Sequence, residues 1–324
     1  MKNNFYKNKK ILVTGADGFV GSFLTEKLLS FGAKVSIYVR SNFTNGLETY
    51  VLRKLPTKTK NNLRQIYSGD LAAADALSLI KADRPEIIFH LAAHAYVPFS
   101  FDHPYEVIQT NIMSTLNVFQ AAMIAKTVKR IVCTSSSEIY GTALTPKISE
   151  SHPLNPTSPY AASKVAVDRL AYSYWQTYNL PVTIMRPFNT YGPRHTYDVI
   201  PRFIRLALHN QPITIYGNGQ QSRDFTYIDD TIKGFLLMGQ TSKIEGLAIN
   251  FGTGKDTSIN KIAQLIVKLS QSKSKIIHLK TRMAEVNKLC CDATLAQKIF
   301  GWQAEIDIEE GLKRNITWAK KNWL

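Results

Sequence analysis

The sequence predicts an α/β fold in which a doubly wound, parallel sheet is followed by a smaller C-terminal α/β lobe. Two observations predict it. Short apolar strand patterns alternate with helical patterns through residue 187, the order expected for a parallel sheet with helices on both faces. After residue 187 the elements become shorter and are interrupted by Gly and Pro. The chain has 324 residues, 44% of them apolar, so it can bury a large core.

The elements of the first part follow from the spacing of their apolar residues. Residues 10–14 form an apolar run closed by glycine, and the segment after it repeats its apolar residues at helical intervals. Pro159 suits the first turn of a helix, with Ser158 as its cap. The expected strands are 10–14, 34–39, 63–70, 86–93, 129–136 and 181–187. The expected helices are 20–31, 73–81, 104–126 and 159–178.

The second part is predicted from shorter patterns of the same two kinds. Its expected helices are 199–209, one from about 230, one from Ile259, 293–299 and one from Ile308. Its expected strands are 213–217, 247–252 and 275–279. We expect this lobe to close over the first.

Composition argues against several classes of protein. The formal charge of +16 suits a polyanion ligand, but the lysine clusters lie far apart and carry no interleaved aromatic residues. We therefore expect an anionic small substrate and no nucleic acid. No apolar run approaches a membrane span, and the basic N-terminus leads directly into a strand, so a cytoplasmic protein with no membrane partner is expected. The three cysteines lack metal or disulfide spacing, and no metal site is expected.

The segment TGADGFVG places Gly15, Gly18 and Gly21 between a strand and a helix. Small residues let the backbone approach a pyrophosphate, and the N–H groups of the helix N-terminus then receive its charge. This context predicts a Rossmann dinucleotide site; a glycine-rich turn made for packing is the alternative. The expected cofactor contacts in this turn are Gly15, Asp17, Gly18, Phe19, Val20 and Gly21.

The end of the second strand bears on the choice of dinucleotide. A carboxylate there suits the ribose 2′-hydroxyl of NAD, whereas an arginine suits the 2′-phosphate of NADP. Here the strand ends with Arg40, followed by Ser41 and Asn42, so NADP is favoured over NAD. A solvated surface arginine is the alternative. Asp70, after the third strand, is expected either to accept from the adenine amine or to cap its own loop.

Tyr160 and Lys164 lie four residues apart near the start of a predicted helix, so both side chains share one face. A tyrosine titrates too high for a base at neutral pH, but a neighbouring ammonium favours the phenolate. A hydroxyl from the preceding strand end completes the set, and Ser136 is the residue we expect there.

Together these motifs resemble the extended short-chain dehydrogenase/reductase family, in the branch that modifies nucleotide-activated sugars. The resemblance covers nearly the whole chain. Its motifs are TGADGFVG, HLAA at 90–93, Asn111, SSSEIYG, SPYAASK, RPFNTYGPR at 186–194, QSRDFTYIDD at 221–230 and RMAEV with DATLAQKIFGW. It implies a dinucleotide-binding domain at 1–187, joined by about 224–257, and a nucleotide-sugar-binding lobe at 188–223 and 258–324.

The resemblance implies a role for each matching residue. Tyr160 takes the proton of the sugar 4-hydroxyl while hydride leaves C4 for the nicotinamide; Lys164 holds the cofactor ribose, and Ser136 binds the same sugar oxygen. Further cofactor contacts are expected at Leu71, Leu91, Ala92 and Ala93. Substrate contacts are expected at Asn189, Arg194, Arg223, Arg282 and Glu285. Ordinary surface polarity is the alternative for the residues of the lobe.

Glu138 suggests which reaction follows. The run Ser136, Ser137, Glu138 resembles the triplet of nucleotide-sugar 4,6-dehydratases, in which a carboxylate near C5 removes the proton made acidic by the C4 ketone and helps to expel the 6-hydroxyl. Ser137 stands where thymidine-sugar dehydratases carry an aspartate, which argues against a thymidine-sugar substrate. Longer stretches, among them SSSEIYGTA, SPYAASKVAVD and LPVTIMRPFNTYGPR, resemble dehydratases of GDP-linked sugars, so a GDP-linked hexose or N-acetylhexosamine is favoured. A carboxylate that caps a loop or pairs with a lysine is the alternative for Glu138.

Other activities and the quaternary state remain open at this point. The alternatives are a nucleotide-sugar 4-epimerase, a UDP-glucuronate decarboxylase in which Arg194 meets the substrate carboxylate, and a non-catalytic NADP-binding protein. The helices at 104–126 and 158–179 carry apolar residues on more than one face, which predicts a homodimer through a four-helix interface. Plain burial of both helices in the core is the rival.

Overall fold

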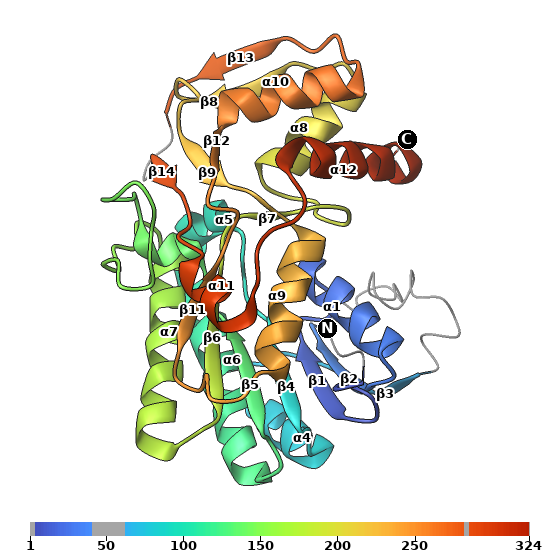
Figure 1. Cartoon of the computed structure of the whole chain (residues 1–324), viewed down its shortest axis with the longest axis vertical. Helices are drawn as coiled ribbons and strands as arrows, with labels where there is room; N and C mark the ends of the chain where they lie inside the picture. Colours follow the sequence, from blue (N-terminus) through green and yellow to red (C-terminus); the bar gives the residue numbers. More distant parts are fainter. Residues whose placement is uncertain (1–3, 41–61, 282–284, 324) are drawn as a thin grey trace. The chain divides into compact units, whose positions relative to one another are not determined.

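The computed structural model describes residues 4–40, 62–281 and 285–323 (Figure 1). The chain divides into two compact units, which are treated separately below. Unit 1 comprises Met1–Ser135, Pro159–Met185 and Ile232–Ala248, and unit 2 comprises Ser136–Ser158, Arg186–Thr231 and Ile249–Leu324. The domain limits expected at 187, 224 and 257 stay a proposal.

A seven-stranded sheet organises unit 1, and its strand order is β11-β6-β5-β4-β1-β2-β3. β1 pairs in parallel with both β2 and β4, and the order reverses at β1, as in a doubly wound fold. The strands are β1 Lys10–Thr14, β2 Lys34–Val39, β3 Leu63–Ser68, β4 Ile87–His90, β5 Arg130–Thr134, β6 Val182–Pro187 and β11 Ala248–Phe251. The predicted α/β fold with a parallel sheet is therefore confirmed.

Helices flank this sheet and close its core (Figure 1). They are α1 Phe19–Ser30, α4 Asp75–Asp83, α5 Val97–Asp102, α6 Pro104–Ala125, α7 Pro159–Tyr178 and α9 Ile228–Gln240. Leu12, Ile88 and Ile184 of the strands and Phe119 and Val167 of the helices are fully or almost fully buried in one apolar cluster. Each such side chain contributes about 1.5–3 kcal/mol by leaving water. This core fixes the carboxyl ends of the strands.

Two short elements differ from the sequence expectation. Residues 97–102, for which the sequence predicted no helix, form α5, because Pro98 preorganises a first helical turn and Ser100 Oγ donates to the carbonyl of Val97 over 2.7 Å. The fifth strand ends at Thr134 rather than continuing to residue 136. A 3₁₀ helix, Ser137–Tyr140, follows it, with the extended Ser136 as its N-cap.

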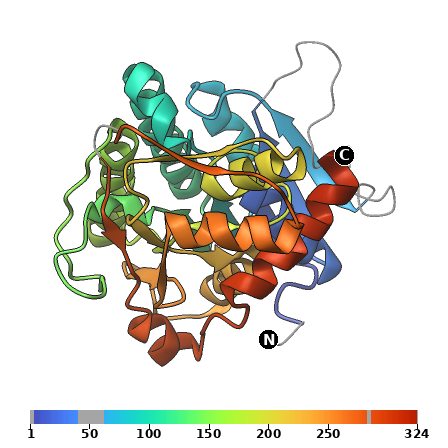
Figure 2. The same ribbon diagram turned by 90° about the horizontal axis from the view of Figure 1, so that it is seen from above.

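Unit 2 is built from short strands and helices. Its helices are α8 Val199–Leu208, α10 Ile259–Ser270, α11 Thr294–Phe300 and α12 Ile308–Trp323. Its strands are β7 Thr190–Tyr191, β8 Ile213–Tyr216, β9 Ser222–Asp224, β10 Thr226–Tyr227, β12 Asp256–Ser258, β13 Ile276–Leu279 and β14 Lys288–Leu289. Figure 2 shows α10 beside α12, which it contacts. Ser258 caps α10, its Oγ accepting from Lys261 N over 3.2 Å.

The strands of unit 2 form three small sheets, of which the one ordered β12-β9-β14 bears on the site. β9 lies between β12, which is antiparallel to it, and β14, which is parallel to it. The buried carboxylate of Asp224 on β9 accepts from the backbone N–H groups of Thr253, Gly254 and Cys291 over 2.8–3.1 Å. These bonds fix β9 and, with it, Arg223.

Candidate active site

The glycine turn after β1 is built for close backbone packing. Gly15 has φ +69°, and a Cβ there would lie 2.8 Å from the backbone N of Ala92. A Cβ on Gly21 would lie 2.1 Å from the carbonyl oxygen of Gly15. Gly18 is the N-cap of α1, no side chain caps the helix, and its first turn contains no acidic residue. The α1 N-terminus therefore fits the pyrophosphate of a dinucleotide.

The other predicted cofactor contacts described in the structure follow the carboxyl ends of β3 and β4. Leu91, Ala92 and Ala93 follow β4, and Ala92 N donates to Thr14 Oγ1 over 3.3 Å. Asp70 accepts from Ala72 N over 2.9 Å, so the structure shows the loop-capping bond for this carboxylate. Leu71 is buried, and its carbonyl accepts from Asn117 over 3.0 Å.

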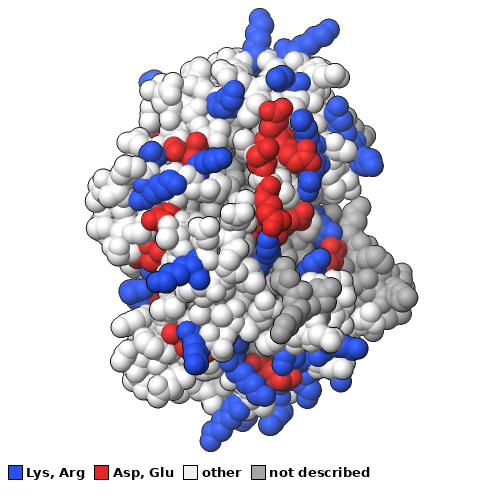
Figure 3. Space-filling view, viewed as in Figure 1, with Lys and Arg blue, Asp and Glu red and all other residues white. Residues whose placement is uncertain are grey.

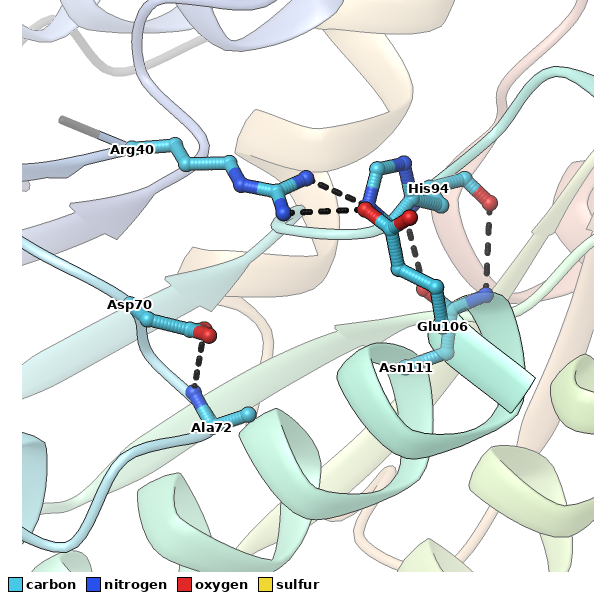
Figure 4. A network of polar contacts seen from close by, with 6 residues as sticks. All are labelled: Arg40, Asp70, Ala72, His94, Glu106 and Asn111. Atoms are coloured by element: carbon cyan, nitrogen blue, oxygen red, sulfur yellow. Dashed lines mark hydrogen bonds and ion pairs between the residues drawn. The ribbon is translucent and has the colours of Figure 1, made fainter. Parts of the chain in front are cut away.

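Arg40, at the carboxyl end of β2, is part of a charged cluster (Figure 4). Its Nη2 lies 3.1 Å from Glu106 Oε1, and His94 Nε2 lies 3.0 Å from the same oxygen. Arg40 and His94 also contact each other directly. The hydrogen bond from Arg40 is the main cause of a lowered pKa at Glu106. His94 and Glu106 are site residues that the sequence analysis missed.

Asn111 connects this cluster to the helix that carries the predicted tyrosine. Its Oδ1 accepts from His94 N over 2.7 Å, and its Nδ2 donates to Ser163 Oγ over 2.9 Å. Ser163 Oγ in turn donates to the carbonyl of Tyr160 over 2.7 Å. Asn111 and Ser163 are both almost fully buried, so this chain of bonds holds α6 and α7 in register at the start of α7.

Tyr160 and Lys164 lie one turn apart on α7, and both are more than 90% buried. Lys164 Nζ donates to the carbonyl oxygen of Thr134 at the end of β5 over 2.8 Å. Burial lowers the pKa of Lys164 to about 8. The geometry places an ammonium that titrates near neutral pH on the same helical face as a buried phenol.

His90 is a buried residue of this region to which the sequence analysis gave no role. Its two ring nitrogens lie 2.8 Å from Thr14 Oγ1 and 3.0 Å from Thr115 Oγ1. Burial, and then the charge of Lys164, lower its pKa to about 3. His90 is therefore neutral at physiological pH, and it fixes the end of β4 beside β1.

The 3₁₀ helix of unit 2 carries the serine and glutamate of the SSSEIYG motif. Ser136 Oγ accepts from Glu138 N over 3.2 Å, and Ser136 and Ser137 are both buried. Gly141 ends the turn at φ +64°, where a Cβ would lie 2.2 Å from the carbonyl oxygen of Asn155. The turn is therefore fixed at both ends, and Glu138 is half-buried on it.

The environment of Glu138 raises its pKa. Burial is the main cause, and the charge of Arg223 opposes it, while Asp198 and Glu285 add to the increase. A carboxyl group with a raised pKa keeps its proton to a higher pH than an ordinary glutamate. The shift at Glu138 is in the direction that acid-base catalysis near neutral pH favours.

A buried polar network anchors the 3₁₀ helix. Tyr140 Oη donates to Asn250 Oδ1 and accepts from Arg186 Nη1, both over 2.7 Å. Arg186 Nη1 also donates to the carbonyl of Glu150 over 3.1 Å. The side chains of Tyr140, Asn250 and Arg186 are all buried. Their hydrogen bonds therefore hold Tyr140 in place and, with it, the 3₁₀ helix that ends at this residue.

Arg223 and Glu285 form an ion pair beside a cavity in unit 2. Arg223 Nη2 lies 3.2 Å from Glu285 Oε1, and Nη1 donates to the carbonyl of Val286 over 2.6 Å. The cavity has a volume of about 430 Å³, within the range of ligand pockets. Its lining residues are Tyr216, Gly217, Asn218, Gln220, Gln221, Thr281, Glu285 and Asn287.

Asn189 and Arg194 lie on the segment after β6. The backbone carbonyl of Asn189 accepts from Thr226 N over 3.0 Å, whereas its buried Oδ1 has no hydrogen-bond partner among the described residues. Arg194 is half-buried and adopts φ +71°. An unsatisfied buried amide oxygen is costly, so Asn189 suits a bound polar ligand. Two predicted contacts, Asn42 and Arg282, lie outside the described residues.

Basic and acidic side chains are interspersed on one face of the protein. On the face shown in Figure 3, Lys and Arg occur from the upper to the lower edge, with Asp and Glu between them, and are densest at the lower edge. None of the helices in the ranges that the structure describes is long and apolar enough to cross a lipid bilayer.

Comparison with known proteins gives the family. The family model described as GDP-mannose 4,6 dehydratase matches residues 12–315. A UDP-glucuronate 4-epimerase of Thermodesulfobacterium geofontis is 36% identical over 96% of both chains. A UDP-N-acetyl-alpha-D-glucosaminuronate decarboxylase of Bacillus cytotoxicus is 33% identical over 97% of this chain and 98% of that protein.

A solved structure agrees with these matches. DesIV of Streptomyces venezuelae, a dTDP-glucose 4,6-dehydratase with NAD bound, superposes with a TM-score of 0.87 at 27% identity and covers 97% of each chain. The relatives therefore include dehydratases, epimerases and decarboxylases that act on nucleotide sugars. The predicted short-chain dehydrogenase/reductase resemblance is confirmed: the chain belongs to the NAD-dependent epimerase/dehydratase family of nucleotide-sugar-modifying enzymes.

Proposed function

We propose that the protein is a nucleotide-sugar 4,6-dehydratase that converts an NDP-hexose or NDP-N-acetylhexosamine to the 4-keto-6-deoxy sugar. The observation that carries this proposal is the half-buried Glu138, held on a fixed 3₁₀ turn with a raised pKa. The other expected groups, Ser136, Tyr160 and Lys164, are all present in the sequence motifs of the family. A carboxylate is the one group among them that suits proton transfer at C5.

The dinucleotide is held by the residues of unit 1. Gly15, Gly18 and Gly21 leave room for its pyrophosphate beside the α1 N-terminus. Arg40 stands where a 2′-phosphate is bound in related folds and supports NADP, whereas DesIV contains NAD. When bound, the dinucleotide would supply a hydride acceptor for C4 of the sugar and a hydride donor for C6.

The protein's own groups move the protons. Tyr160, as the phenolate favoured by the Lys164 ammonium, takes the proton of the 4-hydroxyl, and Ser136 hydrogen-bonds to the same oxygen. Glu138 then removes the C5 proton, which the C4 ketone has made acidic, and delivers it to the departing 6-hydroxyl as water forms. The carboxylate is regenerated as water leaves, so one residue serves as both base and acid. When hydride returns to C6, C5 takes a proton from solvent, and Tyr160 releases the proton of the 4-hydroxyl to solvent.

Residues of unit 2 would bind the nucleotide sugar. Arg223 supplies positive charge for the diphosphate, and Glu285, which lines the 430 Å³ cavity, would hold the nucleotide ribose. Asn189, Arg194 and Arg282 complete the proposed set. The sequence motifs favour a GDP-linked sugar, and Ser137 in place of the aspartate of thymidine-sugar dehydratases argues against a thymidine-linked one.

A 4-epimerase is the second candidate, because the T. geofontis relative has that activity. Epimerisation also uses Tyr160 and Lys164, but it requires no proton transfer at C5, so Glu138 would have no role there. A decarboxylase requires a cation at the substrate carboxylate, which Arg194 would supply. A non-catalytic NADP-binding protein would have no use for the buried Tyr160 and Lys164 pair.

The test is a panel of GDP-, UDP- and dTDP-linked hexoses, hexuronates and N-acetylhexosamines, analysed by mass spectrometry without added reductant. The proposal predicts loss of one water from at least one substrate, with the largest rate for a GDP-linked sugar. An isomer of unchanged mass would support the epimerase, and loss of carbon dioxide would support the decarboxylase.

We further propose a cytoplasmic homodimer formed through α6 and α7. Part of the apolar surface of these helices lies in the core: Phe119 and Val167 are fully or almost fully buried, and Tyr174 is buried. Other apolar side chains on these helices are exposed. They are Tyr105, Ile108, Met113, Ile124, Tyr172 and Tyr178. Sedimentation of the wild type against a variant with charged residues at Met113 and Tyr172 tests the interface.

A further inference from the structure

Arg40 is the residue expected to meet the ribose 2′ substituent, yet its guanidinium is already engaged in the structure. Glu106 Oε1 lies 3.1 Å from Arg40 Nη2 and 3.0 Å from His94 Nε2 (Figure 4). Two more carboxylates are near: the Asp17 carboxylate is hydrogen-bonded to the backbone of Arg40, and Asp70 interacts electrostatically with His94. Among the described residues, the cation expected to receive a 2′-phosphate is therefore already paired with Glu106 and lies near a second carboxylate, Asp17.

Glu106 is held in this position by the fold. It lies in the first turn of α6, where the helix dipole favours a carboxylate. His94, which shares its Oε1, is fixed by two backbone hydrogen bonds to the buried Asn111, of 2.7 and 3.3 Å. His94 is thus held rigidly. Its contact with the Glu106 carboxylate keeps that carboxylate beside Arg40 when the arginine side chain moves.

We propose that Glu106 competes with the 2′-phosphate of NADP for Arg40 and thereby lowers the preference of the protein for NADP over NAD. The 2′-hydroxyl of NAD is neutral and leaves the Arg40–Glu106 pair in place. The 2′-phosphate of NADP is anionic, so it has to displace Glu106 from Arg40 or lie beside the carboxylate at a cost in repulsion. Glu106 is therefore a residue that determines cofactor selectivity, although it lies 66 positions from Arg40 in the sequence.

The size of the effect on NADP affinity depends on how exposed the Arg40–Glu106 pair is. The side chains of Arg40 and Glu106 are 48% and 43% exposed, so solvent screens their attraction. Exposed pairs of this kind contribute roughly 0.2–1 kcal/mol. Replacing Glu106 by glutamine should therefore tighten NADP binding about 1.4- to fivefold and leave NAD binding within experimental error.

The experiment measures the dissociation constants of NAD and NADP by calorimetry on the full chain freed of bound cofactor. The variants are E106Q, R40M and the double variant E106Q/R40M. The matched control is E86Q, because Glu86 is also an unburied glutamate in a surface ion pair, with Lys129 at 3.8 Å, but precedes β4 at its amino end. Thermal midpoints of all variants report whether each is folded.

The proposal predicts that E106Q raises the ratio of NADP to NAD affinity, that E86Q leaves this ratio unchanged, and that the effect of E106Q is much smaller once Arg40 is methionine. Three results would overturn the proposal. They are an equal change in affinity for both dinucleotides in E106Q, no change for either, or a change in the NADP-to-NAD ratio as large in the R40M background as in the wild-type background.

The inference rests on the proposed cofactor site, and the same titrations separate the two failures. Wild-type protein that binds neither dinucleotide would overturn the site and the inference together. Wild-type protein that binds both dinucleotides, with an E106Q ratio equal to that of the wild type, would overturn the inference alone. None of these readouts depends on the sugar substrate or on turnover.

Discussion

Ser136 Oγ accepts a hydrogen bond from the backbone N–H of Glu138 over 3.2 Å, so the serine proposed to bind the sugar oxygen also fixes the turn that carries the glutamate. One element therefore presents both groups. Because the cap is a side-chain oxygen, replacing Ser136 by alanine removes a cap worth about 1 kcal/mol as well as a proposed substrate contact. The spacing of serine and glutamate in SSSEIYG is a consequence of this turn.

Replacing Glu138 by glutamine should stabilise the protein at neutral pH. The folded-state pKa of Glu138 is raised, mainly by burial, so the folded protein binds a proton above the ordinary glutamate pKa, where the unfolded chain does not. The free energy of unfolding therefore falls as pH rises from about 4.5 through the raised folded-state pKa of Glu138. Denaturant unfolding should show E138Q more stable than wild type at neutral pH, with a smaller difference near pH 4. A wild type more stable than E138Q at neutral pH would contradict this sign.

Replacing Tyr160 by phenylalanine should abolish turnover while leaving dinucleotide binding intact. The substitution removes the phenol oxygen that takes the 4-hydroxyl proton, a contribution of about 10²–10⁴-fold, but keeps the ring that fills its buried site. Steady-state rates and calorimetry of NAD binding check the two halves of this expectation. Y172F on the exposed side of the same helix is the control. Undiminished turnover in Y160F would exclude the tyrosine as the base.

Lys164 should make the stability of the protein rise with pH above about 8. Burial lowers its folded pKa to about 8 from 10.5, so between these values the unfolded chain binds the proton and the folded protein does not. The free energy of unfolding then increases with pH in this window, by up to about 3 kcal/mol. The difference between wild type and K164M isolates this contribution from the tyrosines that titrate in the same range. A difference that is flat between pH 8 and 10.5 would show that Lys164 keeps its ordinary pKa.

Replacing Gly21 by alanine should eliminate binding of both dinucleotides. The new Cβ would lie 2.1 Å from the carbonyl oxygen of Gly15, so the turn has to open where the pyrophosphate is expected. The control is G69A, whose Cβ would meet the Tyr38 hydroxyl at 3.3 Å, a contact that a small shift relieves. Calorimetric titration with NAD and NADP is the measurement. Full affinity in G21A would place the cofactor elsewhere.

Most of the fold could be predicted because burial imposes a period on the sequence. β1, α6 and α7 were placed within one or two residues, since each presents an apolar face over several turns or strand positions. The 3₁₀ helix at Ser137–Tyr140 and the short α5 were missed because elements this short contain too few residues to show a period.

The candidate site could be predicted only where its residues form local motifs. Tyr160 and Lys164 lie one helical turn apart, so their shared face follows from the sequence. The contact between Arg40 and Glu106 joins the end of a strand to the start of a helix 66 residues later, and a single sequence gives no signal for such a pair. The partners of Arg40 therefore had to come from the tertiary structure.

The central claim, that Glu138 transfers the C5 proton during water loss, is tested most directly by running the reaction on a GDP-linked hexose in deuterium oxide and locating deuterium in the product by mass spectrometry and NMR. The account predicts that wild-type protein forms a dehydrated 4-keto sugar with solvent deuterium at C5, and that E138Q forms it at least about 10²-fold more slowly. The exposed-surface variant E309Q should match the wild type. Dehydration by E138Q at the wild-type rate would contradict the account.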